Sequence, residues 1–180
     1  MMTVFDVINE RGSIRTYKDA SIPESDLRTI LEAARLAQSA ANRQPWQFIV
    51  VTNKVVKETL VDAAHRPGRP PQSSVRTAAA IIVCLADPEM SRPVGPFNGF
   101  LIDLAIAIEN MALTAWELGI GSCWIGAFQE EAVKTLLTIP DNLRVVSLLT
   151  LGYPDEQPRP KNRKSLTELL HYQRYGQRVP

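Results

Sequence analysis

The spacing of hydrophobic positions divides the 180-residue chain into helical and extended segments. Apolar residues three and four positions apart predict helices near the N-terminus, after Pro23, and over 54–64, 100–118 and 129–137. The short runs 47–52, 78–86 and 144–151 predict strands, and their lack of strict alternation indicates that helices cover both faces of the sheet. Prolines and Gly68 in the segment 65–76 predict a loop. Without a repeat or an internal linker, residues 1–180 are expected to form one domain.

Polar residues and glycines mark where these helices begin and end. Thr3 followed by Asp6 predicts the cap of the first helix, and Pro23 suits the first position of the second. Gly119 predicts the end of the 100–118 helix as its C′ residue. Ser165 with Glu168 forms a capping-box sequence for a last short helix.

The predicted helix 100–118 is apolar on almost every side. A helix of this kind must be covered all round, and a chain of this size has little to cover it with except a second copy of itself. We therefore expect a homodimer whose interface includes this helix. The alternative is the central core helix of a monomer.

Composition and charge narrow the class of protein. A formal net charge of +1 with scattered Lys and Arg offers no basic face for nucleic acid. The apolar runs 78–86 and 101–108, the second broken by Asp103, are too short to cross a bilayer, and no signal peptide is evident, so we expect no membrane association. Cys84 and Cys123 have no neighbouring cysteine and predict packed, reduced thiols in a cytoplasmic protein. His65 and His171 are far apart, so no metal site is expected.

Two polar segments have the chemistry of a ligand site. Arg11, Ser13 and Arg15 surround a flexible backbone point and suit an anionic, planar ligand, although a solvated helix end is the simpler alternative. Pro45 forces the preceding residue into an extended conformation, so 39–44 is expected to be a connection with free backbone amides.

The chain has no nucleophile–base motif, which disfavours hydrolysis. The Gly119-x-Gly121 pair lacks the third glycine and the preceding strand of a dinucleotide-binding turn.

Three motifs resemble the FMN-dependent nitroreductase family. The segment 33–51 matches the family pattern Ala-Arg-x-Ala-x-Ser-x-x-Asn-x-Gln-Pro-Trp-x-Phe-x-Val-Val. The segment 119–128 matches the pattern Gly-x-Gly-x-x-Trp-x-Gly-x-Phe. The last predicted strand ends with Gly152-Tyr153-Pro154, as it does in the family. The resemblance implies an α+β, three-layer sandwich with a central mixed, mainly antiparallel sheet flanked by helices, in an intertwined homodimer. It also implies a C-terminal tail, 165–180, that packs on the partner subunit.

The resemblance further implies which residues hold FMN. A backbone amide donates to flavin N5, and Gly126 is the candidate for this catalytic position. The basic tail supplies Lys161 and Arg163, which with Arg11 neutralise the phosphate. The loop from Ser39 to Asn42 comes from the partner subunit. The complete set of implied cofactor-binding residues is Arg11, Gly12, Ser13, Arg15, Gln38, Ser39, Ala40, Asn42, Trp124, Ile125, Gly126, Ala127, Lys161 and Arg163.

The activity implied is a ping-pong transfer of hydride from NADH or NADPH to a small-molecule electron acceptor, such as a nitroaromatic or a quinone. Many family members have a glutamate near Gly126 that this chain lacks, which bears on substrate preference rather than on flavin binding. The alternatives are a specialised member of the same fold (a deiodinase, a heterocycle dehydrogenase, a flavin reductase or an enzyme of vitamin-ring fragmentation), or a non-catalytic FMN-binding protein. A nucleic-acid binder that uses the basic run 161–164 is a weaker alternative.

Overall fold

The computed structural model describes residues 2–65, 68 and 73–178. The elements follow one another as α1 (Val4–Glu10), α2 (Glu24–Arg35), η1 (Ala40–Asn42), β1 (Trp46–Val51), α3 (Lys54–Ala64), α4 (Ser73–Thr77), β2 (Ala80–Ala86), η2 (Pro88–Met90), α5 (Gly99–Glu117), β3 (Gly121–Ile125), α6 (Glu130–Leu137), β4 (Arg144–Gly152) and α7 (Leu166–Leu169).

The strands form one sheet in the order β1-β2-β4-β3. Each neighbouring pair is antiparallel, as shown by the partners Ile49–Val83, Val83–Leu148 and Trp124–Leu149. The expected sheet was mixed; among the described residues the only parallel pairing is an isolated bridge between Ser13 and Ser122, outside the four strands. That bridge attaches the N-terminal segment to β3.

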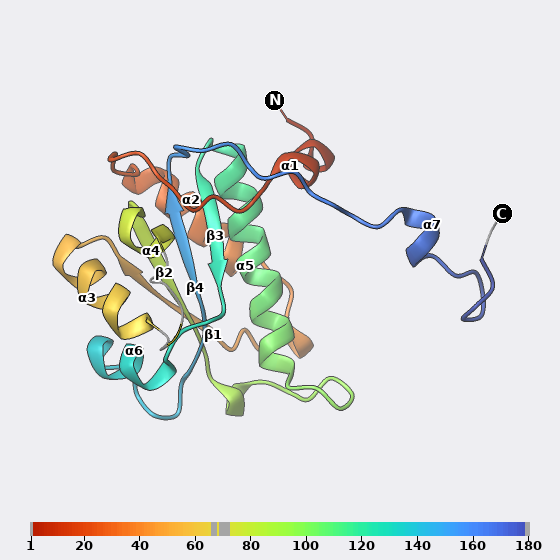
Figure 1. Cartoon of the computed structure of the whole chain (residues 1–180). Coiled ribbons are helices and arrows are strands. Elements are labelled where there is room, and N and C mark those ends of the chain that lie inside the picture. The colour runs from red at the N-terminus through yellow and green to blue at the C-terminus, as the bar shows by residue number, and fades with distance from the viewer. Residues whose placement is uncertain (1, 66–67, 69–72, 179–180) are drawn as a thin grey trace.

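Helices cover both faces of the sheet, which confirms the three-layer α+β prediction (Figure 1). Successive residues of β2 point to opposite faces. Ile82 and Cys84 pack in the cluster that includes α2 and α5, whereas Ile81 and Val83 pack in the cluster that includes α3, α4 and α6. Every residue of β2 is buried as a result, which explains its uninterrupted apolar sequence.

The central helix α5 has one face in the core and another at the surface. Leu104, Ile108 and Met111 are fully buried, whereas Leu101 and Ile102 are exposed. The folded helix is 19 residues long and apolar enough to cross a membrane by length and composition, unlike the shorter apolar runs considered in the sequence. Half of it is buried within this chain, where it packs on α2 and the sheet, and this is the position of a core helix.

The predicted helix ends are largely confirmed. Thr3 and Asp6 form a reciprocal capping box at α1, and Ser165 and Glu168 form another at α7. Gly119 follows α5 with φ +74°, the left-handed conformation expected of a C′ glycine. Pro23 differs by one position, because it is the N-cap of α2 rather than its first helical residue.

Besides the short helical turns η1 and η2, two elements were not predicted. The segment 121–125, interpreted only as a motif with close backbone approach, is the edge strand β3. The interval 65–76, predicted to be a loop, contains the beginning of α4, in which Ser74 and Val75 are buried; residues 66–67 and 69–72 of that interval lie outside the described residues. Both elements are short, so their burial depends on tertiary contacts more than on local pattern.

Both terminal segments expose apolar side chains. Val4, Phe5 and Ile8 of α1 face solvent and only Val7 of that helix is buried. At the other end, the chain beyond Lys161 leads away from the sheet to α7 (Figure 1). Leu166, Leu169 and Tyr175 of this segment are all exposed. In a single chain these side chains therefore lack the cover that their apolar character favours.

Candidate functional site

The segment that carries Arg15 is fixed by residues from the other end of the chain. The backbone N–H groups of Arg15 and Thr16 both donate to Oε1 of Glu156, the second over 3.2 Å. Asp155 N donates to the Thr16 carbonyl over 3.0 Å, and Lys18 N donates to a carbonyl of the same C-terminal segment. These bonds hold the backbone on either side of the Arg15 side chain, so its position is set by tertiary structure and not by a local turn.

Three predicted phosphate ligands lie together beside α1. Lys161 Nζ donates to the carbonyls of Ile8, over 3.4 Å, and Asn9. Desolvation, followed by repulsion from Arg11 and Arg163, lowers the pKa of the Lys161 ammonium. Positive charges that repel one another in this way stabilise a bound anion, because the anion relieves the repulsion. We call Arg11, Lys161 and Arg163 the cation cluster.

A carboxylate on α5 partly balances this charge. Glu109 Oε1 lies 3.5 Å from Nε of Arg11, whose side chain is mostly buried. Among the described residues this is the only ion pair formed by a member of the cation cluster. The pair is long for a charge-assisted hydrogen bond, so the guanidinium keeps most of its donors available.

Ser13 connects the cation cluster to β3. Its neighbour Ile14 donates from the backbone N–H to the Ser122 carbonyl over 2.9 Å, at the start of the strand. Gly12 is buried, and an added Cβ would lie 2.5 Å from Cβ of Pro158. Gly12 therefore permits close packing of the two chain ends, and its predicted contact with a cofactor stays a prediction.

The end of β3 presents an accessible backbone. Ile125 is buried, whereas Trp124 and Gly126 are exposed and Ala127 is partly exposed. A Cβ added at Gly126 would meet nothing closer than Nε1 of Trp124, at 3.8 Å. Because this side of the main chain is unobstructed, a flat ring can approach it, as the sequence motif suggested.

The segment 38–42 lies elsewhere on the molecule. The Ala40 N–H donates to Oδ1 of Asp103, near the N-terminal end of α5, whereas the cation cluster lies beside Glu109. Six residues along a helix correspond to about 9 Å. Figure 1 shows α1 beside the opposite end of α5 from this N-terminal end. Within one chain Gln38, Ser39, Ala40 and Asn42 therefore lie apart from the cation cluster, and their predicted contact with the flavin of a partner subunit stays a prediction.

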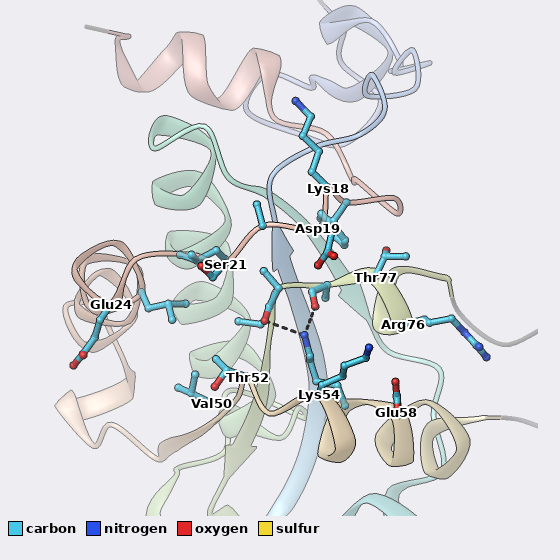
Figure 2. Close-up of a pocket in the computed structure, with 18 residues that line it drawn as sticks. Lys18, Asp19, Ser21, Glu24, Val50, Thr52, Lys54, Glu58, Arg76 and Thr77 are labelled. Atoms are coloured by element: carbon cyan, nitrogen blue, oxygen red, sulfur yellow. Dashed lines mark hydrogen bonds between the residues drawn. The ribbon is translucent and has the colours of Figure 1, made fainter.

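A separate cleft of about 880 Å³ contains none of the predicted site residues. Figure 2 shows it between the segment after Tyr17, α3 and the start of β2. Lys57 Nζ donates to the carbonyls of Ala78 over 2.6 Å and Ala79 over 3.2 Å. Desolvation lowers the pKa of Lys57, while Asp19 and Glu58 oppose that shift. Charges of both signs line this cleft, so it has no evident preference for an anion.

Sequence reasoning missed the carboxylates that hold the predicted segments in place. Glu156 binds the backbone of Arg15, Asp103 binds that of Ala40, and Glu109 pairs with Arg11. Asp103 had a visible signal, because it interrupts an apolar run and a charged residue is seldom buried without a role. Glu156 and Glu109 had none, because each is an ordinary acidic residue until the fold brings its partner near.

Comparison with known proteins adds to this geometry. The Nitroreductase family model matches residues 8–153. A protein of Archaeoglobus fulgidus provisionally named NADH dehydrogenase/NAD(P)H nitroreductase is 41% identical over 155 residues, which cover 84% of this chain and 85% of that protein. The crystal structure of a nitroreductase family protein from Clostridium novyi NT is 36% identical with a TM-score of 0.80, covering 98% of this chain and 97% of that one. An FMN-dependent nitroreductase of Clostridium difficile R20291 is 28% identical with a TM-score of 0.81, covering 94% and 98%.

The fold and these likenesses define the class of the protein, which is an α+β oxidoreductase of the flavin type with a general NAD(P)H-dependent role. Within that class, the chain belongs to the nitroreductase family.

Proposed function

We propose that this protein is an FMN-dependent oxidoreductase that transfers hydride from NADH or NADPH to nitroaromatic, quinone or related electrophilic acceptors in a ping-pong order. The observation that carries the proposal is the cation cluster beside α1, in which Lys161 binds the Ile8 and Asn9 carbonyls and Arg11 lies two positions before Ser13 and its bridge to β3. Residues 1–180 would form one FMN-binding domain. Cytoplasm is the proposed compartment, because Cys84 and Cys123 are both free and buried.

The residues present in this chain fit FMN. A phosphate would relieve the repulsion that Arg11 and Arg163 exert on Lys161, whose pKa is lowered first by desolvation and then by these two cations, with Glu10 and Glu109 opposing the shift. The open backbone at Gly126 accommodates a flat ring. Charge and shape therefore both match a planar cofactor with an anionic tail.

Each residue would have a distinct part in holding FMN. The cation cluster would bind the phosphate, and Ser13, Ser39 and Asn42 would hydrogen-bond the ribityl chain or ring edge. Arg15 would place positive charge beside the pyrimidine ring, which raises the reduction potential, and the Gly126 N–H would donate to N5. Bound FMN would supply the hydride chemistry. The protein's part is to bind, orient and set the charge around it.

We further propose that the active unit is a homodimer. The exposed apolar residues of α1, the outer face of α5 and the segment around α7 provide surface for a second copy, since apolar groups gain by burial. The segment 38–42 of one chain would complete the site that contains the cation cluster of the other. The tail 165–180 would pack on the partner; its last two residues lie outside the described part.

An absorption spectrum of the purified protein tests the cofactor, since bound FMN absorbs visible light and no side chain does. Protein that is colourless and takes up no added FMN would contradict the proposal. Adding NADH or NADPH under argon tests the activity, with rapid bleaching expected from at least one donor. Persistent colour with both would instead indicate a flavin-binding protein without turnover.

A further inference from the structure

Asp103 is a buried carboxylate at the junction of three segments. It lies on α5 and is 2% exposed. Oδ1 accepts the Ala40 N–H at 2.9 Å, and Oδ2 lies 3.4 Å from the Ser91 hydroxyl, whose single proton is shared with the Arg92 carbonyl at the same distance. One side chain thereby joins α5, the segment that contains η1 and the segment that follows η2.

The η1 segment adopts a conformation that its own residues disfavour. Ala41, Asn42 and Gln44 have φ values of +53°, +52° and +49°, although none is glycine, so the extended conformation expected of the residue before Pro45 is not formed. Such left-handed backbone persists only where the surrounding structure holds it. Residues 41–44 are all exposed and supply little packing, so hydrogen bonds must fix this segment.

Few hydrogen bonds are available to fix the η1 segment. Ser39 Oγ accepts the Gln44 N–H at 3.0 Å, and two backbone bonds close the short turn from Ser39 to Arg43. All of these lie within the segment itself. The sequence-based expectation that the backbone amides of 39–44 are free was therefore wrong for Ala40, Asn42, Arg43 and Gln44, whose N–H groups all have acceptors in the folded chain. Among the described residues, the Asp103–Ala40 bond is the one hydrogen bond that ties the turn to the helical body.

The second partner of Asp103 is itself held firmly. At Gly99, the first residue of α5, an added Cβ would lie 1.9 Å from the Arg92 carbonyl oxygen and 2.8 Å from Ser91 Oγ. The chain at 91–92 is therefore pressed against the first turn of α5. Ser91 Oγ therefore stays next to Oδ2, and the shorter bond of the carboxylate is the one from the Ala40 N–H to Oδ1.

Stability alone does not account for a carboxylate here. Asp103 has no ion-pair partner within 4.0 Å among the described residues, and two donors satisfy only part of a carboxylate's capacity. A well-packed apolar side chain is often at least as stable at such a site. A charge-assisted bond is shorter and more directional than packing, so it suits the task of fixing a backbone atom.

We infer that Asp103 is a positioning residue for the flavin site: its carboxylate fixes the turn that presents Ser39 and Asn42 to the FMN of the partner subunit. This inference rests on the proposed function, because it assigns the turn a ligand. It goes beyond that function by naming a residue that touches no cofactor and yet determines how tightly the cofactor is held.

FMN titration of the flavin-free dimer tests the inference with Asp103→Leu and Asp103→Asn. The leucine variant removes the acceptor for Ala40 and should weaken FMN binding by about tenfold or more, while the melting temperature stays the same or rises. Asparagine keeps an oxygen acceptor, so it should restore affinity to within roughly threefold of the parent. Glu117→Gln, at the exposed end of the same helix, is the matched control and should bind as the parent does.

Hydrogen exchange of the flavin-free parent gives a readout that needs no cofactor. The Ala40 amide should exchange at least about tenfold more slowly than that of Ala41, and Asp103→Leu should abolish the difference. If the leucine variant does not fold, Asp103→Ala takes its place in both measurements. Equal exchange at Ala40 and Ala41 in the parent, or leucine-variant affinity within twofold of the parent, would overturn the inference. A parent that binds no FMN would instead overturn the proposed function, and the exchange measurement would still decide whether Asp103 holds the turn.

Discussion

Arg11 and Glu109 face each other across the junction of the N-terminal segment and α5, with Nε and Oε1 3.5 Å apart. The arginine belongs to the cation cluster, and the glutamate is the carboxylate that an incoming phosphate would have to approach. Their relationship defines two opposing contributions to FMN affinity, which can be measured separately.

Arg11→Ala should weaken FMN binding. A charge-assisted contact of this kind contributes about 1.5–3 kcal/mol, which corresponds to roughly tenfold to more than hundredfold in the dissociation constant. Fluorescence titration of flavin-free protein measures the change. Arg28→Ala is the control, since Arg28 pairs with Glu24 on the exposed surface of α2. Equal affinity of the Arg11 variant and the parent would remove Arg11 from the site.

Glu109→Gln should strengthen FMN binding, by roughly threefold at low ionic strength, because it removes a negative charge next to the phosphate site. The gain should shrink as salt is added, since salt screens the repulsion. The same titration at two salt concentrations measures both effects. Weaker binding in this variant would mean that Glu109 serves mainly to orient Arg11.

Leu101→Asp should dissociate the dimer while leaving each chain folded. Leu101 is 44% exposed on the outer face of α5, so a charge is tolerated in one chain but would be desolvated between two. An unpaired charge in an interface should raise the dimer dissociation constant by at least about a hundredfold. Sedimentation and circular dichroism measure assembly and folding.

Leu104 provides the contrast. It lies one turn away on the same helix but is 0% exposed within the single chain, so Leu104→Asp should unfold the protein rather than dissociate it. A Leu101 variant that stays dimeric at low micromolar concentration would show that this face of α5 does not meet the partner.

Glu130 should contribute to stability in a pH-dependent manner. Its carboxylate accepts two bonds from Arg144, at 2.8 and 2.9 Å, and one from the Val145 N–H. The Arg144 bonds, with the Val145 bond as a smaller cause, lower the pKa of Glu130 below its ordinary value of 4.5. The folded state therefore binds this proton less readily than the unfolded state, and the stabilisation is complete above pH 4.5 and lost as the pH falls through the lowered folded value.

Thermal unfolding from about pH 6 down to about pH 3 should accordingly show a steeper loss of stability in the parent than in Glu130→Gln, by about 1 kcal/mol or less because the pair is partly exposed. Glu131→Gln, at the exposed neighbouring position, should follow the parent. Parallel curves for the Glu130 variant and the parent would contradict this assignment.

Sequence patterns predicted helices and helix ends correctly where local signals and burial agreed. The helix 54–64 was predicted with the bounds that α3 has, and Thr3, Gly119 and Ser165 marked helix ends because capping depends on nearby atoms. The strand β3 was missed because its glycine start and its single edge partner give it little local pattern. The predicted apolar stripe of α1 is formed, but of its residues only Val7 is buried, whereas Val4 and Ile8 stay exposed in a single chain.

The candidate site could be predicted only as far as family motifs extend. Arg11, Lys161 and Arg163 were expected to act together, and they are close enough to affect the pKa of Lys161. The supporting carboxylates could not be found in this way, since Glu156 and Arg15 are separated by 141 positions and no local rule relates them.

That separation has a consequence for biosynthesis. The cation cluster takes Arg11 from one end of the chain and Lys161 and Arg163 from the other, and Glu156 ties the two ends together. Nascent protein lacks half of this arrangement until the segment that contains Glu156, Lys161 and Arg163 has emerged from the ribosome. Tight capture of the cofactor should therefore wait until both segments have been made and have folded together, so cells starved of riboflavin should accumulate colourless protein that gains its colour when the vitamin is restored.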